Sequence, residues 1–324
     1  MNRIKDFYKK VRLFLSGLRI YWQDLMFYIR NSNITYSNDT ESKLQSTLTA
    51  SYHIIEKGLT MPDRRLGFGT GVLMDLIWKC RFYIQNFGME SMQLQYALSV
   101  IKEYDDLHKA NGFRLERDVQ EAIDEILLGR EVGPARQFEM THEEFFADAD
   151  APFDRFSRSR HSTRHFDGPV SIDLVRKALA LAQNAPSACN KQPMRAYVVD
   201  NKNVLKQILD LQQGNRGFGH LIDKVIVVTT RYCGCVRYSD RFYPFVDAGI
   251  YSMNLLYSLH FYKIGAIPLV WLSAHDRDNA LRRLIGAGSD EVPCILIGIG
   301  NVADNAVCPS SPRKNIDEVV SVIM

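Results

Sequence analysis

The chain has 324 residues, 46% of them hydrophobic and 24% charged, and its formal net charge is +3. This composition is typical of a globular protein that buries a core, and the small net charge gives by itself no argument for nucleic-acid binding. The length exceeds the usual size of one compact domain, so we expect either one large subunit or two units joined near the middle.

The cysteines and the N-terminal segment bear on where the protein works. Six cysteines are few for this length and none stands in the pattern of a small disulfide framework, so we expect reduced cysteines and a cytoplasmic protein. Residues 1–30 interleave charged with apolar residues, so they contain neither the apolar core of a signal peptide nor the run of roughly 20 apolar residues that spans a bilayer. We therefore do not expect secretion.

Residues 1–30 are predicted to form a basic amphipathic helix. Apolar side chains recur every three or four positions from Ile4 to Tyr28, which places them on one stripe of a helix. Such a helix suits either an anionic membrane surface or packing across a dimer interface, and we favour packing. Its acidic residues are Asp6 and Asp24, and its basic residues are Arg3, Lys5, Lys9, Lys10, Arg12, Arg19 and Arg30.

The rest of the first half is also predicted to be helical. Gly58, with Pro62 just beyond it, is expected to end the first of these helices. We expect no strand before residue 150. The predicted helices cover residues 41–57, 71–87, 89–109 and 115–129.

The pattern changes at the acidic segment 143–154, which we take as the junction between a helical domain (1–150) and a second domain (151–324). In the second domain Ser171 is expected to cap a helix that Pro186 ends. The order of helices and strands is typical of an α+β or an α/β fold, and periodicity alone leaves the two open. The predicted strands cover residues 195–199, 224–230 and 294–299, and a further long helix covers about 241–262.

Three short segments of the second domain are similar to those of a known family. From Ser157 the chain reads SRSRHSTRHFD, from Ala185 it reads APSACNKQP, and residues 312–314 read Pro-Arg-Lys. These resemble the two signature segments and the C-terminal phosphate-binding tail of the nitroreductase family, with one helix of the right length between the first two. The resemblance covers about residues 154–324. It implies an α+β, nitroreductase-like FMN-binding fold with a central, mostly antiparallel sheet flanked by helices.

The resemblance also implies the chemistry. Members of the family bind FMN noncovalently and take electrons from NADH or NADPH, so we expect ping-pong hydride transfer through flavin N5 to a small organic acceptor. The flavin carries this chemistry, so no side chain is expected to act as a general acid or base, and we expect no metal site. The members are intertwined dimers, which implies a homodimer here.

The first signature segment is implied to hold the flavin by charge. Arginine suits a phosphate because its planar fork donates two parallel hydrogen bonds and keeps its proton. Arg164 matches the family's basic residue at the pyrimidine edge of the ring, where a cation favours the reduced flavin. Without the second segment, Arg160 and Arg164 could equally lie on one exposed helix face. The residues implied to lie near the phosphate and ribityl chain are Arg160 and Ser162, with Arg313 or Lys314 closing from the tail. His161 of the same segment is also implied to bind the cofactor.

The second signature segment is implied to reach the flavin from the partner subunit. Small residues such as Ser187 and Ala188 let backbone groups approach a planar ring closely. Read alone, the segment is a helix stop followed by a polar turn. Asn215 is a weaker candidate for the pyrimidine edge, and Pro268 and Leu269 occupy the place where the family offers backbone groups to N5. The residues implied to reach the flavin from the partner are Pro186, Ser187, Asn190 and Gln192. Ala188 of the same segment is also implied to bind the cofactor.

The first half lies outside the common core of the family. Residues 52–69 (YHIIEKGLTMPDRRLGFG) are similar to an extension of some longer nitroreductase-like proteins that occur in polysaccharide biosynthesis clusters. His53 and Glu56 lie one helical turn apart there, but no third metal ligand accompanies them. Two other functions stay open: a flavoenzyme of different chemistry, such as a dehydrogenase or a dehalogenase, and a noncatalytic dimeric scaffold that binds a partner.

Overall fold

A computed structural model describes residues 2–35 and 37–324 of the chain. The chain divides into two compact units, which we describe separately. Unit 1 comprises Met1–Ile55, Gly69–Ala135 and Pro312–Met324, and unit 2 comprises Glu56–Phe68 and Arg136–Ser311. These units differ from the domain boundary predicted at residue 150, which stays a prediction.

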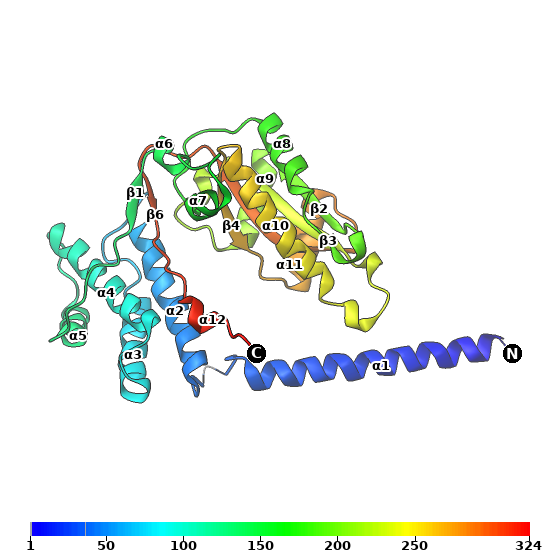
Figure 1. Cartoon of the computed structure of the whole chain (residues 1–324), viewed down its shortest axis with the longest axis horizontal. Coiled ribbons are helices and arrows are strands. Elements are labelled where there is room, and N and C mark those ends of the chain that lie inside the picture. Colours follow the sequence, from blue (N-terminus) through cyan, green and yellow to red (C-terminus); the bar gives the residue numbers. More distant parts are fainter. Residues whose placement is uncertain (1, 36) are drawn as a thin grey trace. The chain divides into compact units, whose positions relative to one another are not determined.

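Unit 1 is built from helices, as the periodicity of the first half predicts (Figure 1). Ser91 caps α4 by accepting a hydrogen bond from the backbone N–H of Leu94, and the apolar faces of α3, α4 and α5 pack together. Leu76, Leu98 and Ile123 are among the side chains buried there. The helices are α1 (Asn2–Asn31), α2 (Glu41–Leu59), α3 (Thr70–Phe87), α4 (Met92–Ala110), α5 (Arg117–Leu127) and the short α12 (Ile316–Val319), and α2 ends inside unit 2.

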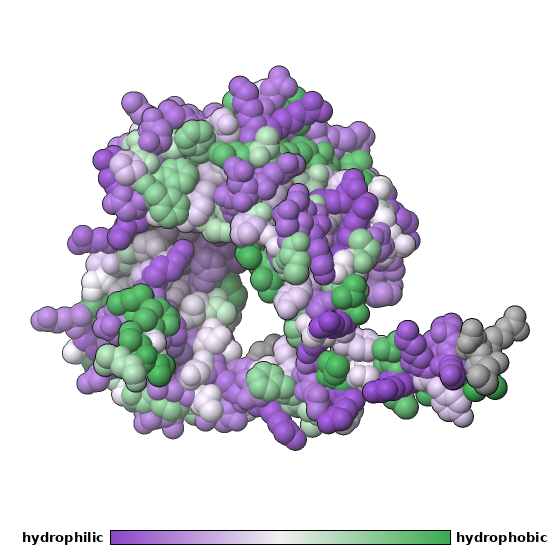
Figure 2. Space-filling view, turned by 45° about the vertical axis from the view of Figure 1, so that its right-hand side comes forward, coloured by the Kyte–Doolittle hydropathy of each residue, from purple (hydrophilic) through white to green (hydrophobic). Residues whose placement is uncertain are grey.

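Helix α1 confirms the predicted amphipathic helix, and its apolar side chains are exposed. Phe14 is 64% exposed and Phe27 is 71% exposed. Figure 2 shows apolar and polar side chains next to each other along this helix. No helix in the described part of the chain is both long and apolar enough to cross a membrane.

Unit 2 is organised around a four-stranded sheet of order β2-β3-β5-β4, in which every neighbouring pair is antiparallel (Figure 1). The strands predicted at 195–199, 224–230 and 294–299 are confirmed. One of the two edge strands, β4, was not predicted, because Pro268 interrupts a short run that carries no alternation. The strands are β2 (Met194–Val199), β3 (Lys224–Arg231), β4 (Gly265–Val270) and β5 (Glu291–Gly300).

Helices cover both faces of this sheet, and together they give the α+β fold that was predicted. Along β3, Ile226 and Val228 face α8 and α10, whereas Val225 and Val227 face α9 and α11. Because both faces are buried, β3 reads as a continuous apolar and β-branched run. The flanking helices are α8 (Ile172–Ala182), α9 (Lys202–Gln212), α10 (Tyr243–Phe261) and α11 (His275–Ile285), with α6 (His142–Phe145) and α7 (Phe153–Ser159) preceding them.

Two predictions about the first 150 residues were wrong. A strand does precede residue 150: β1 (Phe138–Met140) pairs antiparallel with β6 (Ala306–Cys308), and three residues are too few to produce a detectable alternation. Gly58 does not end α2, which continues to Leu59. A Cβ on Gly58 would stand 2.0 Å from the Phe68 ring, so the glycine is required for this close approach.

Candidate functional site

The first signature segment is extended and fixed on both sides by backbone hydrogen bonds. It leaves the end of α7 at Arg160. The Thr163 N–H donates to Ala266 O at 3.3 Å, and the Ala303 N–H donates to His165 O at 3.1 Å. The segment therefore runs between the edge strand β4 and the chain that follows β5. Alternation along it sends the side chains of Arg164 and His165 to opposite sides.

Arg164 is buried, which shows that the alternative of an exposed helix face was wrong. Its side chain is 6% exposed, and its Nε and Nη1 atoms have no hydrogen-bond partner among the residues that the structure describes. The guanidinium lies 5.8 Å from the centre of the Phe218 ring. Burial lowers its pKa, and the charge of Glu56 partly opposes that shift. A buried donor without an acceptor destabilises a fold, so this side chain is suited to an acceptor supplied from outside the chain.

The charges of Arg160 and His161 act on a second buried group, His260. Burial, followed by the charges of Arg160 and His161, lowers the pKa of His260 in α10 to about 4. His260 Nε2 lies 2.8 Å from Ser159 Oγ, so α10 holds the residue that precedes the segment. The His161 ring meets the Phe138 ring edge-on, with 5.0 Å between their centres. Ser162, between Arg160 and Arg164, is half-buried.

The second signature segment forms a strained, exposed turn. Helix α8 ends at Ala182, before Pro186, and a 3-10 turn follows at η1 (Ala188–Asn190). Cys189, Asn190 and Gln192 adopt φ values of +54°, +54° and +49°, which non-glycine residues rarely do. Gln192 Nε2 donates to Asn190 Oδ1 at 3.0 Å, and both side chains are exposed. Such strain is concentrated at functional sites, although the turn alone does not name the ligand.

Asp247 holds this turn in place and was not found by sequence analysis. Its side chain is 4% exposed, and its Oδ1 accepts the Ala188 N–H at 3.0 Å. The Ser187 hydroxyl accepts the Gln192 N–H at 2.9 Å, which closes the turn from within. An acidic residue within the otherwise apolar sequence of α10 is the signal that could have pointed to Asp247.

The three remaining candidates of unit 2 lie in packed surroundings. Asn215 Nδ2 donates to Leu209 O at 2.7 Å and to Gln212 Oε1 at 3.0 Å, so its amide caps the end of α9. Pro268 and Leu269 lie in β4. Leu269 is 4% exposed in the core, so only its backbone could face a ligand.

The tail residues Arg313 and Lys314 belong to unit 1. Lys314 Nζ donates to Gln45 Oε1 at 2.8 Å within that unit. The structure gives no position for the tail relative to the first signature segment, so their role at the phosphate stays a prediction.

Residues 56–68 belong to unit 2, a placement that sequence analysis missed. His165 Nε2 lies 2.9 Å from Thr60 O. Met61 Sδ lies 3.2 Å from the position that a Cβ of Gly217 would take. Segment 56–68 therefore packs on the first signature segment and on the loop that follows Asn215. Only the resemblance of residues 52–69 to an extension could have pointed to it.

The sequence of unit 2 matches known proteins. Residues 157–215 match the sequence model of the nitroreductase family, a range that contains both signature segments and Asn215. In this range the chain is therefore similar to the nitroreductase family.

Individual relatives match this domain at modest identity. A protein of Methanothermobacter thermautotrophicus described as an NADH dehydrogenase/NAD(P)H nitroreductase is 26% identical over 149 residues, 46% of this chain and 76% of that protein. The nitrobenzene nitroreductase of Ectopseudomonas oleovorans is 47% identical over 51 residues, 15% of this chain and 22% of that enzyme. A nitroreductase structure from Exiguobacterium sibiricum in complex with FMN is 19% identical, with a TM-score of 0.46, covering 53% of this chain and 98% of that one.

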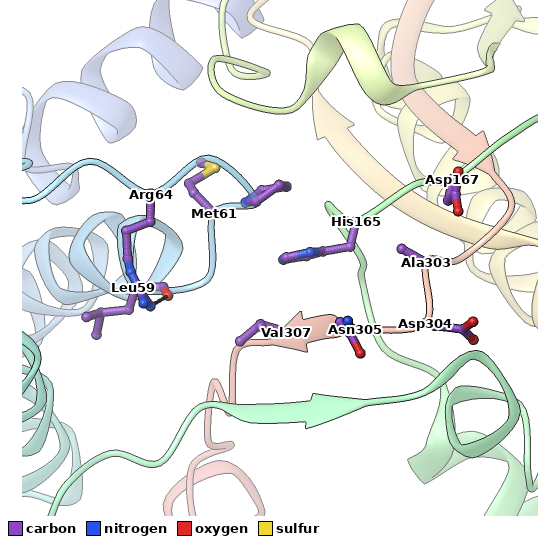
Figure 3. Close-up of a pocket in the computed structure, with 10 residues that line it drawn as sticks. Leu59, Met61, Arg64, His165, Asp167, Ala303, Asp304, Asn305 and Val307 are labelled. Atoms are coloured by element: carbon purple, nitrogen blue, oxygen red, sulfur yellow. Dashed lines mark hydrogen bonds between the residues drawn. The ribbon is translucent and has the colours of Figure 1, made fainter.

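A cavity of about 630 Å³ lies on the opposite side of the first signature segment from Arg164. Figure 3 shows the His165 ring directed into it, toward the segment that carries Leu59 and Met61. Burial is the main cause that lowers the pKa of His165. The wall is completed by Pro62, Arg64, Asp167, Ala303, Asp304, Asn305 and Val307, so one basic side chain, Arg64, stands against two acidic ones, Asp167 and Asp304.

Proposed function

We propose that the protein is an FMN-dependent oxidoreductase that uses NADH or NADPH to reduce a small organic acceptor. The observation that carries this proposal is the buried guanidinium of Arg164, which stands in a nitroreductase signature segment with two N–H groups unpaired among the described residues. A flat ring with acceptor atoms along one edge, which gains negative charge on reduction, fits this donor set. FMN, when bound, supplies the hydride chemistry through N5.

Different residues of the chain would bind different parts of FMN. Arg164 would donate to the pyrimidine edge, and Arg160, with Ser162, would hold the phosphate and ribityl chain. In the tail, Arg313 or Lys314 would add a further cation at the phosphate. None of these side chains has to move a proton, because their contribution is position and charge.

A second copy of the chain would complete the site. Asn190 and Gln192 are exposed on a turn that Asp247 holds in a strained conformation. A loop that is preorganised in its bound conformation loses little conformational entropy when a partner binds it. We therefore propose a homodimer in which this turn closes the flavin site of the other subunit. The resemblance of residues 52–69 adds a polysaccharide biosynthesis context without naming the substrate.

Cofactor binding tests the proposal directly. Purified protein should carry flavin absorbance, or acquire it with one FMN per chain on reconstitution. Arg160→Ala combined with Arg164→Ala should abolish binding, because it removes both guanidinium groups. Arg283→Ala, on the exposed face of α11, is the matched control and should bind FMN normally. Loss of the flavin absorbance on anaerobic mixing with NADH or NADPH then tests the donor.

Two results would contradict the proposal. Stoichiometric binding of FMN by the double variant would show that the two arginines do not hold the flavin. A wild-type protein that stays colourless with excess FMN would instead favour the noncatalytic dimeric scaffold. If the wild-type flavin is present but neither nicotinamide reduces it, a flavoenzyme of different chemistry is favoured.

A further inference from the structure

Helix α7, from which the first signature segment starts, is short and packs on α10. It has seven residues, none of which is buried, and a helix this short is unstable on its own. The Phe156 ring lies 5.5 Å from the Tyr257 ring and 5.4 Å from the His260 ring, measured between ring centres. His260 Nε2 lies 2.8 Å from the Oγ atom of Ser159, the last residue of α7. One turn of α10 therefore contacts both the middle and the end of this helix.

His260 is buried among aromatic rings, where a histidine is an expensive choice. It is 2% exposed, and its ring contacts those of Phe145, Phe146 and Phe156 at 5.4 to 6.2 Å between centres. The Ser159 hydroxyl donates its one proton to Phe156 O at 3.0 Å, so His260 Nε2–H is the donor of the bond to Ser159. Nδ1 has no hydrogen-bond partner in the described chain, which destabilises the fold. The bond to Ser159 is the contribution that an apolar side chain could not make.

Residues 160–162 lie between two fixed points. Before them, Ser159 is held by His260. After them, the Thr163 N–H donates to the backbone of the edge strand β4 at 3.3 Å. Arg164 lies beyond this second point. Loss of the first point should therefore loosen residues 160–162 and leave Arg164 in place.

Other contacts also act on α7 and on this span. Arg155 in α7 forms an ion pair with Asp148, but it is largely exposed, and exposed pairs contribute little. The His161 ring contacts the rings of Phe138 and Phe145, at 5.0 and 6.4 Å between centres. These ring contacts hold the middle of the span, whereas the hydrogen bond from α10 holds its start.

We propose that His260 positions the phosphate-binding part of the first signature segment through its hydrogen bond to Ser159. Arg160 and Ser162 are the residues that it would place at the FMN phosphate. Burial lowers the pKa of His260 to about 4, so the side chain is neutral at pH 7 and acts through position and not through charge. This inference rests on the proposed function, in which these two residues hold the phosphate.

A comparison of two flavins provides the test, because riboflavin has the ring of FMN and lacks its phosphate. Ser159→Ala removes the acceptor of the hydrogen bond, and His260→Phe removes the donor and keeps an aromatic ring. Each should weaken FMN binding about tenfold and change riboflavin binding little, because a displaced guanidinium loses charge-assisted bonds to the phosphate. Titration of flavin fluorescence with the full chain measures both affinities. The reduction potential of bound FMN should keep its wild-type value, because Arg164 lies beyond Thr163.

Control variants separate positioning from packing. His260→Gln keeps an N–H that can reach Ser159, so it should keep most of the preference for FMN. Ser258→Ala removes a buried hydroxyl of α10 that donates to Asn254 O within the helix at 2.8 Å, and it should leave both affinities unchanged. In a chain that already carries Arg160→Ala, Ser159→Ala should change the ratio of the two affinities little further.

The outcomes distinguish this inference from the proposed function. If Arg160→Ala removes the preference for FMN but Ser159→Ala and His260→Phe keep it, the inference is overturned and the flavin assignment stands. Equal losses of affinity for FMN and riboflavin would mark a general structural role of His260 and overturn the inference as well. If the wild type binds neither flavin, the proposed function fails, and the inference fails with it.

Discussion

The two signature segments are held in opposite ways. The first, around Arg164, is buried and bound on both sides by backbone hydrogen bonds to β4 and to the chain after β5. The second, around Asn190, is exposed, and it keeps its conformation through the internal bonds of the turn and two contacts with other segments, made by Asp247 and by Lys191, whose Nζ donates to Gly234 O at 2.6 Å. Both segments lie within residues 157–215, which match the sequence model of the nitroreductase family.

This difference indicates how the proposed site is divided between two copies of the chain. A buried segment with unpaired donors is complete on the protein side and lacks an acceptor. The exposed side chains of a strained turn can contact the surface of a second chain. A site that takes its charge from one segment and its closing turn from the other therefore needs two chains, each of which contributes one half.

Mixing two defective chains gives the largest expected effect. One chain carries Arg160→Ala with Arg164→Ala, and the other carries Asn190→Ala with Gln192→Ala. Each alone should bind little FMN. Refolded together, random pairing makes about half of the dimers mixed, and each mixed dimer has one site with both intact segments, so about a quarter of all sites should recover. FMN bound per chain, measured by absorbance after desalting, gives the answer.

The control for this experiment mixes each defective chain with itself through the same refolding. No recovery in the mixed sample, although mixed dimers are detected by mass spectrometry, would show that both segments serve the site of their own chain. Nearly full binding by the Asn190→Ala, Gln192→Ala chain alone would remove the turn from the flavin site altogether.

Lowering the pH should reduce the stability of the protein through His260, which belongs to the surroundings of the first segment and not of the second. The pKa of His260, beside Arg160 and His161, is about 4, whereas histidine in an unfolded chain titrates near 6.5. The unfolded state therefore takes up a proton between these values and the folded state does not. This contribution to stability is complete above about pH 6.5 and is lost as the pH falls toward 4, by about 3 kcal/mol at most.

Urea unfolding at pH 7.5 and at pH 4.5 measures this effect. His260→Gln should show a smaller loss of stability at the lower pH than the wild type, because the titrating group is gone. His275→Gln, which removes an exposed histidine at the start of α11, should behave like the wild type. An equal loss of stability in all three proteins would assign the acid sensitivity to other groups.

The parts that sequence could predict are those with local signals. Long apolar runs, such as those of α10 and β3, were placed within a few residues. Ser171 caps α8 as predicted, since its side chain accepts the Asp173 N–H. The two signature segments were found because their residues are contiguous. The fold class followed from these elements and from the resemblance.

The parts that sequence could not predict depend on contacts between distant residues. In the sequence, Gly58 is typical of a helix end. In the structure, the absence of a side chain at Gly58 lets the Phe68 ring pack against the helix. In the sequence, Asp247 is one acidic residue on a long helix. Its role becomes visible only in the structure, where it accepts the Ala188 N–H. The burial of Arg164 and the effect of the Glu56 charge on its pKa arise only when distant segments of the chain pack within unit 2, and no periodicity contains that information.

Helix α1 offers the smallest expected effect on the flavin. Its stripe is exposed, as Phe7 at 64% and Trp22 at 62% show, and its basic residues also suit an anionic surface. We favour packing against a second copy, because the proposed site already requires one. Deleting residues 1–31 should then weaken dimerisation in sedimentation velocity runs and leave FMN affinity at saturating protein nearly unchanged. Flotation with anionic phospholipid vesicles should recover both proteins equally, and flotation of the full chain alone would assign α1 to a membrane surface instead.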